Sequence, residues 1–356
     1  MSTAAGLLGA AAGRVLVYIG PDLSVQAQRN AVVLGDLLRG VVDTSTSEGA
    51  ATGILAGQRR GRATATLGEI RNRADLVMFW GVDPAQRYPR FQSRYAPAPS
   101  GTQVPNGRAG RTVISVTIGA DKAPADADLT VILDPTEEIA ALSLMRAAAA
   151  ERLGTTVGPS LQRAVELVPR LAGARYAVLV HDADPTEERR HRLRVEGLIG
   201  LTQALNAHTR AALLSLRAGG NRSGAESVLT WQTGFPFAVD HSRGYPRYTP
   251  EERGLTRLSR GGFQAALIVG TPTLPEEAMT ALQRIGTVAI GPGASRAAFG
   301  ARVAIDTGVA GIHEGGTAYR MDDVPLSLRP PLPSERMAVE ILGSLAETLR
   351  AGRGPA

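Results

Sequence analysis

Residues 14–43 read RVLVYIGPDLSVQAQRNAVVLGDLLRGVVD. The apolar run Arg14–Ile19 predicts a buried strand, Gln26–Arg39 has the spacing of an amphipathic helix, and Val41–Asp43 returns toward the same sheet. Strand, helix and strand in this order form the repeating unit of a parallel sheet. The stretch therefore predicts an α/β fold.

The same alternation continues along the chain. We expect further strands at 75–80, 113–118, 129–133, 176–180, 265–269, 287–290 and 302–305, and helices at 66–73, 137–153, 162–171, 187–208, 275–285 and 334–350. Two turns, Gly20-Pro21-Asp22 and Gly270-Thr271-Pro272, follow a strand and precede a helix. Open α/β sheets bind ligands at such turns, although neither turn has a GxGxxG or P-loop pattern.

Composition limits the possible functions. A chain of 356 residues is long enough for two domains. It contains no cysteine, which excludes thiolate catalysis, disulfides and thiolate ligands for iron–sulfur clusters, zinc or molybdenum. The formal net charge is +6, and of 39 basic residues only Lys122 is lysine. No nucleic-acid recognition motif accompanies this charge. The apolar runs are too short to cross a membrane, and the N-terminus lacks the charged region of a signal peptide, so we expect a cytoplasmic protein.

Aromatic residues are concentrated in one segment, GGNRSGAESVLTWQTGFPFAVDHSRGYPRYTP at 219–250, which contains five of the fifteen. Trp231 and Tyr245 are among them, interleaved with arginines and glycines, and Pro236, Pro246 and Pro250 argue against a long helix. One interpretation is an ordered loop that binds a flat or anionic ligand or a partner. The other is a crossing loop packed by its own aromatic side chains.

Arginines recur at 87, 90 and 94, directly after a strand end. On a helical turn they would share one face, either at the ligand edge of the sheet or in solvent. The segment 91–111, rich in Pro, Gly and Arg, predicts a surface loop or an arm toward a partner. The basic run at 187–192 predicts a solvated helix face.

Acid–base candidates are Ser47, Glu48, His181 and Asp182, but no two histidines have metal-ligand spacing. Capping and turn roles explain these four residues equally well.

Several blocks occur in an order that resembles one known family. They are Ala27-Gln28-Arg29; 66–75 (TLGEIRNRAD); Trp80-Gly81; 88–90 (YPR); 93–95 (SRY); Leu205-Asn206 with Thr209; 228–234 (VLTWQTG); 242–248 (SRGYPRY); and 314–322 (EGGTAYRMD). Over nearly its whole length the chain resembles the B subunit of formylmethanofuran dehydrogenase, within the molybdopterin oxidoreductase superfamily.

Two departures from that family affect the expected function. Redox-active members have an N-terminal CxxCxxxC-type cluster segment and, after the first βαβ unit, a Cys-His pair whose cysteine binds tungsten or molybdenum. Here the chain starts at that unit, and the loop reads Ser47-Glu48. The resemblance therefore implies neither an iron–sulfur cluster nor a tungsten or molybdenum pterin. It points to the cofactor-less B subunit of the formyltransferase/hydrolase complex of methylotrophic bacteria.

That resemblance implies a non-catalytic structural subunit in tetrahydromethanopterin-linked oxidation of formaldehyde to formate. The partners would be amidohydrolase-like, formyltransferase and C-type subunits. The emptied pterin cavity would suit the polyglutamate tail of the carrier methylofuran. We expect its lining to consist of Arg90, Arg94, Arg222, Trp231, Arg243, Tyr245 and Arg247.

The fold implied by the superfamily has two doubly wound, Rossmann-like domains, one inserted into the other, as in a molybdopterin oxidoreductase core without its iron–sulfur segment. Residues 14–43 and 205–310 would form the host, 44–204 the insert, and 311–356 a C-terminal extension with a final helix. The alternative function is a pterin–metal dehydrogenase subunit that uses Ser47 or Glu48 as an oxygen ligand.

Overall fold

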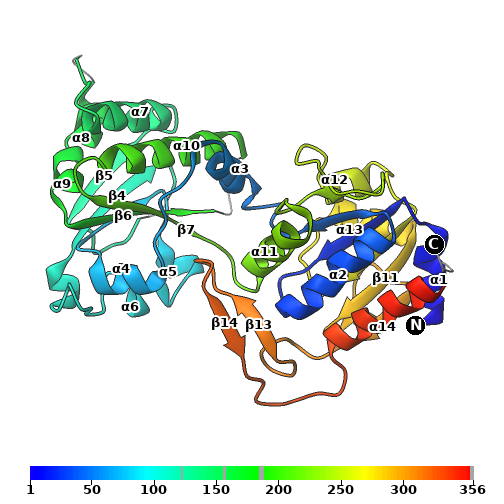
Figure 1. The fold of residues 1–356 in the computed structure, drawn as a ribbon. Coiled ribbons are helices and arrows are strands. Elements are labelled where there is room, and N and C mark those ends of the chain that lie inside the picture. Colours follow the sequence, from blue (N-terminus) through cyan, green and yellow to red (C-terminus); the bar gives the residue numbers. More distant parts are fainter. Residues whose placement is uncertain (122, 155–157, 184–187, 353–356) are drawn as a thin grey trace. The chain divides into compact units, whose positions relative to one another are not determined.

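The computed structural model of the protein describes residues 1–121, 123–154, 158–183 and 188–352 (Figure 1). It divides into two compact units. Unit 1 comprises Met1–Glu48 and Gly219–Ala356, and unit 2 comprises Gly49–Ala218. Each unit contains its own sheet, and both sheets consist mainly of parallel strands. The predicted α/β class with parallel sheets is therefore confirmed.

Unit 1 has a seven-stranded sheet in the order β12-β11-β10-β1-β2-β8-β9. The five parallel strands are β1 (Val15–Ile19), β2 (Val41–Thr44), β10 (Ala265–Val269), β11 (Gly286–Gly291) and β12 (Val303–Asp306). Two short strands, β8 (Val239–Asp240) and β9 (Arg247–Tyr248), extend the sheet beyond β2, and β8 is antiparallel to β2. The sheet is thus built from segments that are far apart in the sequence.

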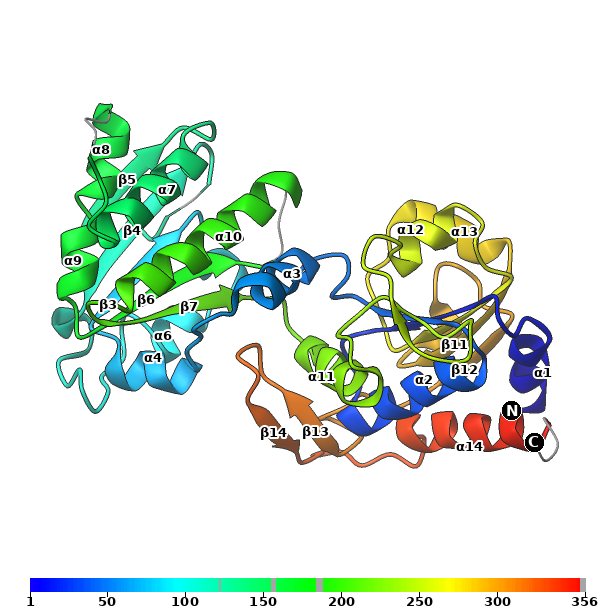
Figure 2. The same cartoon turned by 45° about the horizontal axis from the view of Figure 1, so that its top comes forward.

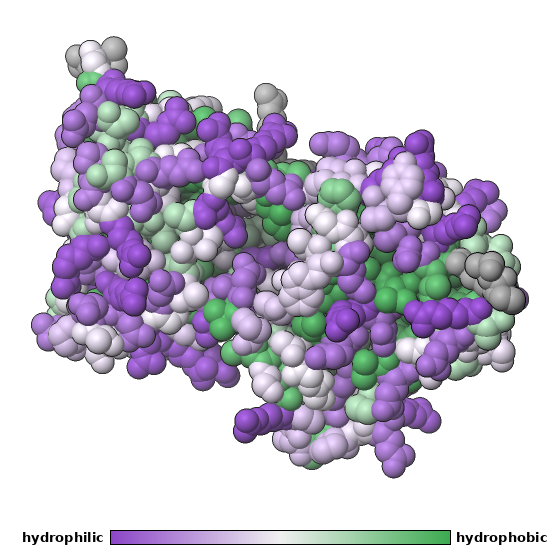
Figure 3. Space-filling model, in the orientation of Figure 1, coloured by the Kyte–Doolittle hydropathy of each residue, from purple (hydrophilic) through white to green (hydrophobic). Residues whose placement is uncertain are grey.

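Helices cover both faces of this sheet. On one face lie α1 (Ser2–Ala10), α2 (Val25–Leu37), α11 (Arg222–Thr233) and α14 (Ala338–Ala351), and on the other α12 (Gly254–Ser259) and α13 (Glu276–Gln283). Ser24 caps α2 by accepting a hydrogen bond from the Ala27 amide at 3.2 Å. Figure 3 shows hydrophobic residues gathered on the surface of unit 1 around α2 and α14. A hairpin of β13 (Gly316–Tyr319) and β14 (Pro325–Leu328) lies beside the N-terminal part of α2 (Figure 2).

Unit 2 has a five-stranded, fully parallel sheet in the order β5-β4-β3-β6-β7. Its strands are β3 (Leu76–Trp80), β4 (Thr112–Ile118), β5 (Leu129–Leu133), β6 (Tyr176–Asp182) and β7 (Arg210–Leu216). One face carries α3 (Ala51–Arg60), α7 (Glu138–Ala149), α8 (Pro159–Val165), α9 (Val168–Gly173) and α10 (Glu188–Leu205). The opposite face carries α4 (Leu67–Arg73), α5 (Pro84–Arg87) and α6 (Phe91–Arg94), as Figure 1 shows.

Several sequence expectations need correction. The boundary expected at 205 lies too early, because β7 follows α10 and pairs with β6, which places residues up to 218 in unit 2. Residues 311–356 are not a separate extension, since α14 contributes to the core of unit 1. The helix expected at 162–171 is two helices that meet at residues 166–167, with Pro169 in the first turn of α9.

The basic run at 187–192 falls partly outside the described residues, which exclude 184–187. Within it, His191 is buried and Arg192 is exposed, so the run is not a uniformly solvated face. Among the residues that the structure describes, no helix combines the length and apolar character that a membrane crossing requires.

Candidate functional site

The strand order of unit 1 reverses between β1 and β10, where an open α/β sheet commonly binds a ligand. Here the two turns bond to each other. The Gly20 amide donates to the Val269 carbonyl at 2.7 Å, and the Asp22 carboxylate accepts from the amide and hydroxyl of Thr271 at 2.8 and 2.6 Å. A Cβ added at Gly20 would lie 3.0 Å from Pro272 Cδ. The chain itself closes this crossing point, which leaves little room for a dinucleotide.

Asp43, near the end of β2, is fully buried and accepts four hydrogen bonds. Its Oδ1 accepts from the Ser47 hydroxyl at 2.5 Å, the Thr44 amide at 2.8 Å and the Ala238 amide at 3.1 Å, and its Oδ2 accepts from the Gly254 amide at 2.6 Å. Burial raises the pKa of Asp43, and these hydrogen bonds oppose the rise. One carboxylate therefore ties together three segments that are far apart in the sequence.

Ser47 stands where the resemblance places a metal-binding cysteine. Its side chain is completely buried, and its hydroxyl donates to Asp43 as described above. Its amide donates to the Thr44 carbonyl at 3.0 Å. Glu48, the next residue, is exposed. The hydroxyl of Ser47 thus has a structural role and does not face an open cavity in which a ligand to tungsten or molybdenum would sit.

The aromatic segment 219–250 is not a single loop. Its first part forms α11, because all three prolines follow Thr233 and Gly234 ends the helix in the left-handed conformation at φ 87°. Asn221, just before α11, fixes the start of the helix. It donates to the Leu23 carbonyl at 2.9 Å, and its Oδ1 accepts from the Tyr319 amide at 2.6 Å. The first part of this segment is thereby joined to the loop after β1 and to β13.

The five aromatic residues divide into two groups. Phe235 stacks on Tyr248 with 5.1 Å between ring centroids, and Phe237 meets the edge of the same ring. These three side chains pack on one another, as expected for a loop packed by its own aromatic residues. Trp231 and Tyr245 remain 58% and 53% exposed, and Trp231 contacts Tyr319 at 6.0 Å. The second group therefore has the larger exposed surface for a ligand or a partner.

The predicted lining residues of unit 1 lie at opposite ends of its sheet. Arg222 begins α11 beside the loop that follows β1, at the carboxyl end of the parallel strands. Because β8 is antiparallel to β2, the turn after it lies at the amino end, where the His241 amide donates to the Gly40 carbonyl. Arg243 and Tyr245 lie on this turn, and Arg247 follows it and pairs with Asp240 at 3.1 Å. These residues do not form one continuous row within unit 1.

Arg90 and Arg94 belong to unit 2, on the segment that leaves the carboxyl end of β3. Both are exposed, and neither forms an ion pair with another described residue. Arg87 differs, because it pairs with Asp182 at 2.6 Å. The three arginines do not share one helical face, since α5 ends at Arg87 and α6 begins only at Phe91.

Buried polar groups gather at the carboxyl edge of the sheet in unit 2. Glu138 is fully buried, accepts from the Trp80 indole at 2.9 Å and pairs with Arg194, which also contacts Asp121 at 3.0 Å. His181 bonds to the Ser215 hydroxyl at 2.8 Å. Burial lowers the pKa of His181 well below its usual value, and His191 and Arg194 lower it further. The imidazole is thus neutral at physiological pH and held inside the fold.

The segment 91–111 is a packed loop and not a free arm. Arg111 is only 4% exposed and donates to four carbonyls: those of Ala74 at 3.0 Å, Pro97 at 2.9 Å, Pro99 at 2.5 Å and Arg71 at 2.6 Å. Burial, with Arg71 nearby, lowers the pKa of Arg111. The guanidinium holds the loop against the C-terminal end of α4, where carbonyl groups favour a cation.

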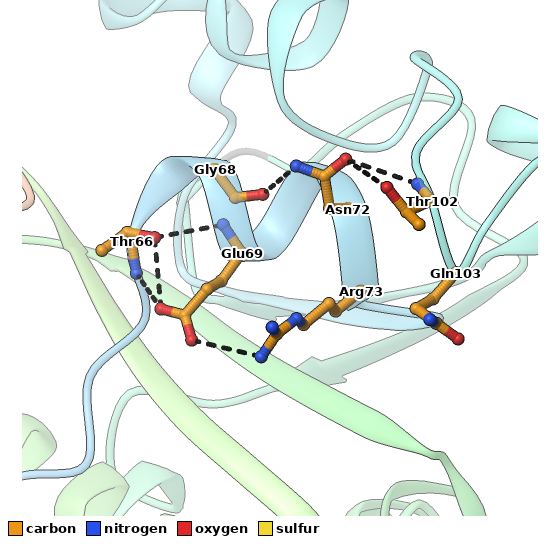
Figure 4. A pocket seen from close by; sticks show the side chains of 7 residues that line it. All are labelled: Thr66, Gly68, Glu69, Asn72, Arg73, Thr102 and Gln103. Carbon is orange, nitrogen blue, oxygen red and sulfur yellow. Dashed lines mark hydrogen bonds and ion pairs between the residues drawn. The ribbon is translucent and has the colours of Figure 1, made fainter.

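An open, polar cleft of about 410 Å³ lies beside α4 (Figure 4). Thr66 and Glu69 bond reciprocally in a capping box, and Asn72 accepts from the amide and hydroxyl of Thr102 at 3.3 Å. A neighbouring cleft of about 580 Å³ shares Asn72 and Thr102 with it. The side chains that line both clefts bond mainly to one another. The TLGEIRNRAD block therefore stabilises α4 and its contact with the neighbouring loop.

Metal binding has no geometric support in the part of the chain that is described. No three side chains among His, Asp and Glu converge there as a set of metal ligands. The chain contains no cysteine, so no thiolate is available as a ligand to tungsten or molybdenum, and the Ser47 hydroxyl is buried and bonded to Asp43.

Comparison with known proteins identifies the family. No family model matches the chain. The chain is 32% identical over 348 residues to the B subunit of the tungsten-containing formylmethanofuran dehydrogenase 2 from Methanocaldococcus jannaschii, and the match covers 94% of this chain and 80% of that protein. Its counterpart from Methanococcus maripaludis is 31% identical over 325 residues, or 88% and 74% of the two chains. The chain therefore belongs to the family of formylmethanofuran dehydrogenase B subunits.

A solved structure points to a particular branch of this family. The chain resembles one from the formyltransferase/hydrolase complex (FhcABCD) of Methylorubrum extorquens in complex with methylofuran, with a TM-score of 0.82 and 26% identity. The match covers 99% of this chain and 96% of that one. The resemblance seen in the sequence is thereby confirmed along the whole length.

Sequence reasoning did not find Asp43, Asn221 or Arg111. Asp43 and Asn221 are buried polar residues that organise the carboxyl edge of unit 1, and Arg111 organises the loop beside α4. For Asp43, the sequence offered one signal of this role, namely a polar residue at the end of an apolar strand.

Proposed function

We propose that this chain is a non-catalytic structural subunit of a formyltransferase/hydrolase complex in tetrahydromethanopterin-linked oxidation of formaldehyde to formate. In that complex it assembles with amidohydrolase-like, formyltransferase and C-type subunits. The observation that supports this most directly is the environment of Ser47. The hydroxyl at the position of the family's metal ligand is buried and bonded to Asp43, and the chain contains no cysteine to replace it.

The pterin–metal alternative has no observation in its favour. Metal analysis of the purified complex tests the choice between the two functions. We expect tungsten and molybdenum far below one atom per chain. Near-stoichiometric metal on this chain would overturn the non-catalytic role.

We further propose that the chain helps to bind the polyglutamate tail of methylofuran. The support is the exposure of Arg90 and Arg94 near the carboxyl edge of unit 2, where neither forms an ion pair with another described residue. Each exposed arginine–carboxylate contact contributes at most about 1 kcal/mol. Two such contacts, at Arg90 and Arg94, would together amount to at most about 2 kcal/mol, or roughly thirtyfold in affinity. A tail with many carboxylates can meet such a set of arginines repeatedly.

The carrier proposal is tested on the purified complex by measuring methylofuran per complex with mass spectrometry. Arg90→Ala with Arg94→Ala is expected to lower the carrier content by about tenfold after a salt wash, since two contacts are lost. Arg302→Ala is the matched control, because Arg302 is exposed, unpaired among the described residues and located before the amino end of β12. Unchanged carrier content in the double variant would refute this binding role.

Arg243→Ala tests whether the carrier tail binds at the amino end of the sheet in unit 1. The turn that bears Arg243 lies at the amino end, so we expect little change in carrier content. A loss as large as that of the Arg90 and Arg94 variant would place the tail at the amino end instead.

A further inference from the structure

Three exposed arginines of unit 2 gather around one carboxylate, that of Glu196 on α10. Arg59 and Arg60 are the last two residues of α3, which lies beside α10 (Figures 1 and 2). Arg59 Nη1 lies 3.4 Å from Glu196 Oε1, and Arg60 Nε lies 3.8 Å from Glu196 Oε2. Arg192, one turn before Glu196 on α10, places its Nε 3.6 Å from Oε1. We call these four residues the α3–α10 basic cluster.

One carboxylate does not saturate three guanidinium groups. Each guanidinium has five N–H donors, whereas the two oxygens of a carboxylate accept about four hydrogen bonds in all. All three distances exceed the roughly 2.7–2.9 Å of a strong charge-assisted hydrogen bond. The side chains of Arg59, Arg60 and Arg192 remain 55%, 44% and 56% exposed. The cluster therefore keeps donors for further carboxylates.

The end of α3 does not depend on these guanidinium groups. Basic residues in the last turn of a helix often bind the carbonyl groups that lack a partner there. Here Gln203 of α10 takes that place, because its side-chain amide donates to the Arg60 carbonyl at 2.7 Å. The side chains of Arg59 and Arg60 contact Glu196 instead.

The sequence around the cluster carries an excess of three positive charges. Residues 49–68, which include α3, contain Arg59, Arg60 and Arg62 and no acidic residue. Residues 184–196 contain four arginines and four acidic residues, so they are balanced and the excess comes from α3 and the segment after it. Neither stretch contains Phe, Tyr or Trp on which nucleic-acid bases could stack. A chain of carboxylates fits both the charge and the lack of aromatic rings.

We propose that the α3–α10 basic cluster binds a carboxylate-rich chain, and that Glu196 takes the place of one ligand carboxylate until that chain displaces it. The proposed function supplies such a chain in the polyglutamate tail of the carrier, and this identification alone rests on the proposed function. The cluster is separate from Arg90 and Arg94, whose segment covers the opposite face of the sheet. A tail with many carboxylates gains affinity from each further set of arginines that it meets.

The test measures binding of a fluorescein-labelled oligoglutamate peptide to the full-length chain by fluorescence anisotropy at low ionic strength. The triple variant Arg59→Ala, Arg60→Ala and Arg192→Ala is expected to bind about tenfold more weakly, since three exposed contacts are lost. The matched control removes the same charge from three other exposed arginines of unit 2, which form no ion pair with a described residue: Arg152→Ala, Arg163→Ala and Arg170→Ala. Equal losses in the two triple variants would overturn the proposal.

Glu196→Gln is expected to act in the opposite direction. It removes the internal carboxylate and leaves the three arginines in place, so peptide binding should tighten by about threefold. Glu166→Gln is its control, because it removes an exposed carboxylate elsewhere in unit 2. A Glu196→Gln chain that binds no more tightly than the control would overturn the role of Glu196.

Further measurements keep the outcomes distinct. If the triple variant fails to fold by circular dichroism, the single variant Arg192→Ala replaces it, with Arg163→Ala as its control. A wild-type chain that does not bind the peptide overturns this inference, whatever the complex contains. A purified complex without methylofuran refutes the carrier proposal and leaves peptide binding by the cluster unaffected. Duplex DNA that binds as tightly as the peptide, with the same loss in the triple variant, would overturn the preference for carboxylates.

Discussion

Asp43 is expected to be the most sensitive single side chain of unit 1. Replacing it in Asp43→Ala leaves three backbone amides and the Ser47 hydroxyl without their acceptor in a site closed to solvent. An unsatisfied buried donor costs about 1–3 kcal/mol, and water that enters the vacated space recovers part of the loss. From the four unsatisfied donors we therefore expect a loss of about 4 kcal/mol in the free energy of unfolding of unit 1.

Asp43→Asn gives a graded comparison. Its remaining oxygen still accepts from Ser47, Thr44 and Ala238, but its amide group faces the donor of Gly254. A loss of about 2 kcal/mol is expected. Urea unfolding followed by circular dichroism measures both changes. Hydrogen exchange in peptides covering 41–47 and 238–254 assigns them to unit 1, because a chain with two units need not unfold in one step. Asp126→Ala, at an exposed surface pair, is the control. A loss below about 1.5 kcal/mol for Asp43→Ala would refute the reasoning.

Three further changes have defined outcomes. Arg111→Met should destabilise unit 2 by about 3 kcal/mol in urea, because four carbonyls lose a largely buried donor. The exposed Arg73→Met should cost under about 0.5 kcal/mol, and equal effects of the two substitutions would contradict this reasoning. His181 resists protonation when folded, so wild-type stability should fall as the pH drops below about 6.5, by up to about 1.4 kcal/mol per unit. His181→Gln should flatten that slope, and an unchanged pH profile would argue against it. Ser47→Cys should take up no tungsten or molybdenum by elemental analysis, since the side chain at this position is buried beside Asp43; stoichiometric metal would contradict the structural role.

The sequence predicted most of the parallel strands because they are continuous apolar runs between helices. It missed β7, whose segment RAALLSL is rich in alanine and leucine and lacks the β-branched residues typical of strands. It missed α11 because the prolines that argue against a helix in this segment all follow Thr233. Local patterns were sufficient where an element's own residues determine its structure.

The site was harder to predict because its contacts are distant in sequence. Nothing near Arg243 shows that β8 runs antiparallel to β2, a pairing between residues 41–42 and 239–240. That direction alone decides which end of the sheet Arg243 occupies. In the same way, the role of Ser47 depends on Asp43, and the role of Asp43 on amides about 200 residues further along the chain.

The division of unit 1 into two separate stretches affects how the chain is made. Val15 of β1 pairs with Ala265 of β10, 250 positions later, whereas unit 2 is continuous from Gly49 to Ala218. During synthesis at about 5–20 residues per second, unit 2 can fold first. The start of β10 at Ala265 lies 47 positions after the end of unit 2 at Ala218, and synthesis of this stretch takes roughly 2–10 s. Throughout that interval β1 lacks its neighbour β10 and exposes apolar side chains. The nascent chain is therefore most in need of chaperone protection between the completion of unit 2 and the emergence of β10.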